Sequence, residues 1–87
     1  MKVLKSKKEV VNFNLDSIAD RLELLLEPQI ELDDDDVFDI SVKVISLLRP
    51  LMPIAEIDVC IEETLIDLAS DEGGDYRKLL KRYYLSQ

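Results

Sequence analysis

Residues 53–70, PIAEIDVCIEETLIDLAS, decide the fold that we predict for this chain. Apolar side chains recur in this stretch at spacings of three and four, at Ile54, Ile57, Ile61, Leu65 and Leu68. Such spacing places them on one stripe of a helix, the side that packs on a core. A proline suits the start of a helix, and the glycines at 73 and 74 follow the last apolar residue as helix-ending glycines do. The stretch therefore predicts a long central helix.

Two apolar residues of the same stretch fall outside this stripe. Val59 and Ile66 are seven apart, so they share a different side of the helix. Either the central helix is covered on two sides, which is the interpretation we favour, or the pair is an exposed apolar spot. A strand is also conceivable, because Ile57, Val59 and Ile61 alternate with polar residues, but the helical pattern continues through Leu68.

The flanking segments predict three more helices. The first runs over residues 15–27 and stops before Pro28, and the second runs over 37–49, with the aspartates at 33–36 at its start. The last follows the two glycines, with Asp75 as its cap, and residues 10–15 give a weak strand signal. We predict an all-α fold, a small four-helix bundle-like single domain over residues 1–87. The alternative is α+β, with central strands near 38–45 and 56–62.

Composition excludes several functional classes. The chain has no histidine, one cysteine and two adjacent glycines, so His-based catalysis, cysteine-built metal sites and glycine-rich phosphate loops are not expected. No cofactor and no bound metal are predicted. No apolar run is long enough to span a bilayer and the basic N-terminus lacks the apolar segment of a signal peptide, so we expect a cytoplasmic protein with no membrane partner.

Charge is distributed unevenly along the chain. The net charge is −8, and all 19 acidic residues lie between the basic ends, at 9–75, where only Arg21, Lys43 and Arg49 oppose them. Such a body attracts basic partners and repels nucleic acid. The predicted partner-binding residues are carboxylates of the aspartate run and of the central helix: Asp33, Asp34, Asp35, Asp36, Asp39, Glu56, Glu63 and Asp67.

These carboxylates predict a small acidic protein-binding module that is not an enzyme. Its function would be to inhibit a basic partner protein, such as a toxin, a nuclease or another nucleic-acid-handling protein. In size and acidity the chain is similar to bacteriocin and contact-toxin immunity proteins and to phage DNA-mimic inhibitors. The basic tail, YRKLLKRYY at 76–84, has cations and aromatic residues, but direct nucleic-acid binding is not expected beside so acidic a body.

Two alternative functions remain open at this stage. The small core and the two-sided central helix would suit a structural or adaptor homodimer. The cluster of Glu62, Glu63 and Asp67 resembles the helix-borne acids of all-α nucleotide pyrophosphohydrolases, and that resemblance implies a small magnesium-dependent hydrolase.

Overall fold

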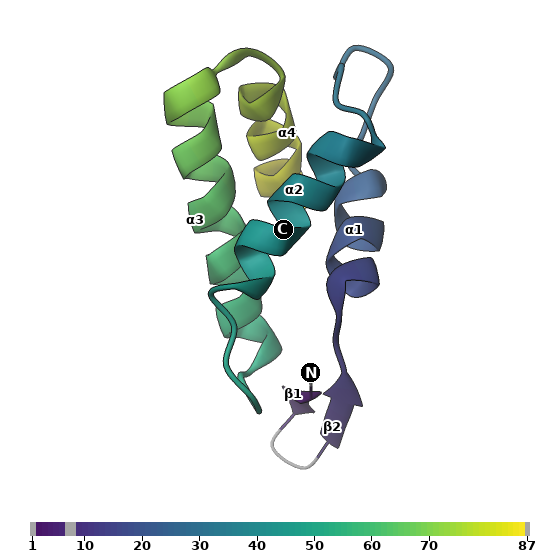
Figure 1. The fold of residues 1–87 in the computed structure, drawn as a ribbon, viewed down its shortest axis with the longest axis vertical. Helices are drawn as coiled ribbons and strands as arrows, with labels where there is room; N and C mark the ends of the chain where they lie inside the picture. Colours follow the sequence, from purple (N-terminus) through teal and green to yellow (C-terminus); the bar gives the residue numbers. More distant parts are fainter. Residues whose placement is uncertain (1, 7–8, 87) are drawn as a thin grey trace.

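The computed structural model describes residues 2–6 and 9–86 and is mostly helical. A β-hairpin of β1 (Lys2–Ser6) and β2 (Glu9–Asn12) leads into four helices. These are α1 (Leu15–Glu23), α2 (Asp34–Ile45), α3 (Ile54–Glu72) and α4 (Gly74–Leu85). The hairpin lies at one end of the long axis and the α3–α4 turn at the other, while α2 lies between α1 and α3 (Figure 1).

The prediction of a mainly helical fold with a long central helix is confirmed. In α3, Ile57, Ile61, Leu65 and Leu68 are buried, and α4 packs along this helix. The side chains of α1 and α2 meet them in one core. Val59 and Ile66, by contrast, remain 50% and 37% exposed, so in this chain they form the exposed apolar spot and not a second covered side.

Local capping explains where the first two helices begin. Asn14 and Ser17 form a reciprocal capping box at α1, and Asp33 and Asp36 form one at α2, so backbone N–H groups that lack helical partners are satisfied. The aspartate run therefore starts α2 as predicted, although the helix begins at Asp34, three residues before the predicted start. Both helices also end before their predicted ends, α1 at Glu23 and α2 at Ile45.

The α3–α4 turn depends on one glycine. Gly73 has φ 64° and ψ −145°, a conformation that side chains with a Cβ strongly disfavour, and it both ends α3 and precedes α4. The prediction that Asp75 caps α4 is wrong, because Asp75 lies inside the first turn of that helix. Its carboxylate instead accepts a hydrogen bond from the backbone N–H of Glu31 at 3.1 Å.

The hairpin is absent from the all-α prediction, although the weak strand signal at residues 10–15 overlaps β2. Its strands pair antiparallel, with Val3 opposite Val11, and Val3 is fully buried. The link between α2 and α3 borders β1, since Leu4 N–H donates to the Met52 carbonyl at 3.0 Å and Leu51 N–H donates to the Lys2 carbonyl at 2.7 Å. The strands near 38–45 and 56–62 in the α+β alternative do not form, because those residues lie in α2 and α3.

Candidate functional site: surface hollows between charged helices

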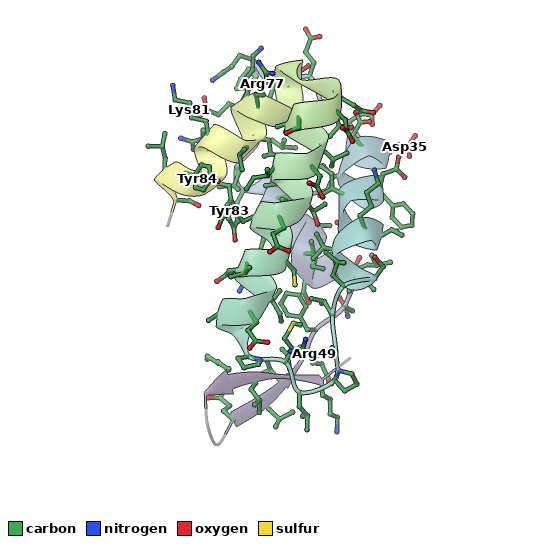
Figure 2. The ribbon with its side chains drawn as sticks, turned by 90° about the vertical axis from the view of Figure 1, so that its left-hand side faces the viewer. Asp35, Arg49, Arg77, Lys81, Tyr83 and Tyr84 are labelled. Atoms are coloured by element: carbon green, nitrogen blue, oxygen red, sulfur yellow. The ribbon has the colours of Figure 1, made fainter. Side chains whose placement is uncertain are left out.

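The aspartates predicted to bind a partner gather at the start of α2. Asp33 and Asp36 bind backbone N–H groups in the capping box, whereas Asp34, Asp35 and Asp39 are exposed. Asp35 points away from the bundle, on the side opposite the basic residues of α4 (Figure 2). Two members of this group thus have a structural task and three present free acceptor oxygens to solvent.

The predicted carboxylates of α3 form a separate group. Glu56 pairs with Arg49, whose Nη2 lies 2.8 Å from the carboxylate oxygen, and this pair lies near the hairpin end. Glu63 and Asp67 are exposed farther along the helix. The structure therefore does not bring the eight predicted residues together into one continuous acidic site.

A cationic groove lies between α4 and the link that follows α1. We call it the α4 groove; its volume is about 350 Å³, and its lining residues are Glu27, Gln29, Ile30, Lys78, Lys81, Arg82 and Leu85. Arg82 Nε lies 2.5 Å from a carboxylate oxygen of Glu27. Lys78 Nζ donates to the Gln29 carbonyl at 3.1 Å. Lys81 is exposed and points outward from α4, so its ammonium group faces the solvent (Figure 2).

Two further hollows lie beside α1. The first is lined by Arg21 and Asp58, whose side chains meet at 2.6 Å, and by Tyr83, whose hydroxyl donates to the Asp58 carbonyl at 2.9 Å. The second, which we call the hairpin hollow, has a volume of about 450 Å³ and is lined by Phe13, Asn14, Leu15, Asp16 and Ile45. Its one charged lining residue is the acid Asp16.

A fourth hollow is acidic. Carboxylates of Glu31, Asp36, Glu72 and Asp75 line it, together with Tyr76. Burial raises the pKa of the Tyr76 phenol, and the nearby charges of Asp36 and Glu72 raise that pKa further. The phenol is therefore neutral at physiological pH and remains a hydrogen-bond donor.

The cysteine of α3 has an unreactive environment. Burial raises the pKa of the Cys60 thiol, with a further contribution from Glu63 that outweighs the lowering effect of Arg49. A thiol with a raised pKa holds less of the nucleophilic thiolate at neutral pH, so the surroundings of Cys60 favour a structural role over a reactive one.

Comparison with known proteins identifies the family. The ATP cone domain family matches residues 1–86, nearly the whole chain. This chain belongs to the ATP-cone family. No significant match to this chain was found among curated proteins or among solved structures. The ATP cone is a regulatory nucleotide-binding domain that provides allosteric control of ribonucleotide reductase-like enzymes.

The family assignment overturns the function predicted from composition. An inhibitor that resembles immunity proteins or DNA mimics is the wrong class, because the matched domain is regulatory and nucleotide-binding. High acidity does not identify the function of this chain, since net charge informs about solubility and association but not about fold. Among residues 2–6 and 9–86, no three Asp, Glu, Cys or His side chains come together in a way that could hold a metal ion. None of the helices in this part of the chain is both long and apolar enough to cross a membrane.

The phosphates of a nucleoside triphosphate fit one of the four hollows by charge. Proteins bind phosphate through Lys and Arg side chains and through backbone N–H groups. Because this chain has glycine only at 73 and 74, it has no glycine-rich loop whose backbone N–H groups could surround a phosphate. The α4 groove offers three cations, Lys78, Lys81 and Arg82. Arg82 is paired with Glu27, and Lys78 Nζ lies 3.4 Å from a carboxylate oxygen of Asp75, so among the described ion pairs Lys81 alone of the three has no carboxylate partner. The hairpin hollow and the acidic hollow offer no cation, and Arg21 in the remaining hollow is already paired with Asp58.

Proposed function

We propose that this ATP cone is a regulatory domain that binds a nucleoside triphosphate and changes the state of an enzyme to which it is attached or bound. The match to the ATP cone domain over residues 1–86 carries this proposal. The proposed role is regulatory and not catalytic; the chain has no histidine, the usual general base at neutral pH. A cytoplasmic location, where nucleoside triphosphates are abundant, suits the same role.

The α4 groove is the proposed place for the phosphate groups. Lys81 is not among the described ion pairs, so it can approach a phosphate without giving up a protein partner. Lys78 and Arg82 can contribute further donors, while Ile30 and Leu85 give the groove an apolar part for the base or sugar. The bound nucleotide would supply negative charge that competes with Glu27 for Arg82.

This competition suggests how binding would be transmitted. Arg82 and Lys78 attach the link after α1 to α4 through Glu27 and Gln29. The same link ends at Asp33, the cap of α2. A phosphate that draws Arg82 away from Glu27 would therefore loosen the link, and the start of α2 would respond. The nucleotide shifts the equilibrium between the attached and the loosened arrangement of the link only to the extent that it binds the loosened arrangement more tightly.

Calorimetric titration with ATP and dATP, each with Mg²⁺, tests the proposal at low and at physiological salt. We expect binding that weakens as salt rises, because the contacts are between exposed charges. Lys81→Ala should weaken ATP binding by about fivefold to tenfold, the range of one charge-assisted contact at a partly exposed site. Lys43→Ala is the matched control, because Lys43 is exposed on α2 and lines none of the four hollows described above.

A second variant gives an effect of the opposite sign. Glu27→Gln removes the carboxylate that holds Arg82, so ATP affinity should rise by about threefold or more. Glu23→Gln, at the exposed last residue of α1 and outside the lining of the α4 groove, should leave the affinity unchanged. If ATP binds but neither groove variant changes its affinity, the groove is the wrong location; if neither nucleotide binds at millimolar concentration, the nucleotide-binding function itself is refuted.

A further inference from the structure

A line of exposed apolar side chains runs along the outer side of α2. Phe38, Val42 and Ile45 are spaced by four and three, so they lie on one side of the helix, and we call them the α2 strip. Phe38 is 55% exposed and Val42 is 42% exposed, while Ile45 is half-buried. Single exposed apolar residues are common on proteins, but three in one line make a continuous surface that water covers poorly.

The strip does not end at α2. Ile45, its last member, also lines the hairpin hollow together with Phe13 and Leu15. The apolar surface thus continues from the middle of α2 into a concave region of about 450 Å³ at the start of α1, directly after the hairpin in the chain. An exposed apolar line that leads into a hollow has the shape of a groove for a partner helix.

The edges of this surface are acidic. Asp34, Asp35 and Asp39 are exposed on α2, and Asp16 lines the hairpin hollow. Glu23 lies seven residues after Asp16, on the same side of α1, and is exposed too. None of the ion pairs in the described part of the chain uses any of these five carboxylates. Apart from the exposed Lys43 of α2, the acidic surroundings of the strip have no cationic side chain assigned to them by these described pairs.

We propose that the α2 strip is the docking surface for a basic amphipathic helix of a partner protein. Such a helix would place apolar residues at i, i+4 and i+7 on Phe38, Val42 and the hairpin hollow, and its flanking Lys and Arg residues would face the carboxylates. The strip is part of a helix about 18 Å long, at about 1.5 Å per residue, so a partner helix of about three turns covers it.

The chain's own basic helix is a poorer occupant than a separate partner. α4 directs Leu79 and Tyr83 into its own core, and both are buried there. Its outward side carries Arg77 and Lys81 with Tyr84 (Figure 2), and so presents fewer apolar side chains than an amphipathic helix would. This inference concerns a surface distinct from the α4 groove, and it does not depend on nucleotide binding.

Two synthetic peptides of 18 residues, made only of Leu and Lys, test the proposal with the whole chain. One peptide has helical amphipathic order and the other has the same composition in scrambled order. We expect the ordered peptide to bind at least tenfold more tightly, and its amide chemical-shift changes to concentrate in α1, α2 and the hairpin. Phe38→Ser should weaken its binding at least fivefold. Val59→Ser, at the 50%-exposed apolar position of α3, should change it less than twofold.

Three results would overturn the proposal. Equal binding of the scrambled peptide would show that charge alone attracts it. An equal loss with Val59→Ser would show that any apolar spot on this acidic surface serves. A dimer of the chain in sedimentation equilibrium that Phe38→Ser dissociates would show that a second copy, and not a partner helix, covers the strip. Circular dichroism of both variants controls for folding.

Discussion

Replacement of two isoleucines of α3, one at a time, tests the packing on which the fold depends. Ile61 is fully buried, whereas Ile66, five residues along the same helix, is 37% exposed on the opposite side. Ile61→Ala and Ile66→Ala remove the same three carbons from the same element. Any difference between them therefore reports the surroundings of each side chain and not its chemistry or its helix propensity.

The expected magnitudes follow from burial. Three buried carbons contribute about 2.4 kcal/mol at about 0.8 kcal/mol each, and the cavity left in a close-packed core adds to this, so Ile61→Ala should cost about 3–4 kcal/mol. Ile66 loses less burial and creates no closed cavity, and alanine is a better helix former by about 0.4 kcal/mol, so Ile66→Ala should cost about 1 kcal/mol or less.

Urea denaturation followed by circular dichroism measures both changes. Domains of this size have a free energy of unfolding of about 5–15 kcal/mol, so Ile61→Ala should lower the midpoint strongly, and the melting temperature by about 12–30 °C at about 4–8 °C per kcal/mol. If the two variants lose the same free energy within error, α3 does not present Ile61 to the core and Ile66 to solvent. The arrangement of the helices, and every surface argument based on it, would then be refuted.

The remaining predictions concern caps, the α3–α4 turn and the thiol. Asp33→Ala and Asn14→Ala should each lower the free energy of unfolding by about 1 kcal/mol in urea melts, because each removes a capping box. Gly73→Ala should cost about 1–3 kcal/mol through backbone strain, since the nearest atoms to an added Cβ lie at 3.8 Å or beyond. Cys60 should react slowly with a disulfide reagent at pH 8 and faster in urea. The pKa of the Cys60 thiol is raised in the folded state, so the stability linked to this thiol is fully present below the pKa that the thiol has in the unfolded chain. This stability is lost as the pH rises through the pKa of the folded state. Urea melts of the wild type and of Cys60→Ser at pH 8 and pH 10 would measure the loss.

Helices were predictable wherever one stripe of apolar residues continued over several turns. The periodicity of Ile57, Ile61, Leu65 and Leu68 places them in the core, and the structure buries all four. The hairpin was missed because its stability is not local. Val3 is fully buried although the residues around it are rich in Lys. On its other side, β1 forms hydrogen bonds with backbone groups of Leu51 and Met52, nearly fifty residues later in the chain.

The site was less predictable than the fold for the same reason. The basic character of α4 is evident in the sequence, but its groove needs Glu27 and Gln29 from a link about fifty residues earlier. The pair of Arg21 and Asp58, with Arg21 5.5 Å above the Phe13 ring, likewise joins residues 37 apart in sequence. No local signal gives such pairs. Carboxylates dominate the composition and pointed to a binding inhibitor, whereas the family match over residues 1–86 is to a nucleotide-binding domain.

The separation of charge between the two flanks has a consequence for how this domain meets other molecules. Arg77 and Lys81 project from α4 on one side and Asp35 from α2 on the other (Figure 2), so charges of opposite sign face opposite sides of a molecule whose short extents are 22 and 23 Å. In dilute buffer a charged neighbour exerts a torque on such a body and turns it before the surfaces touch. At physiological ionic strength the field decays over about 8 Å, so this alignment would begin only within the last few water layers.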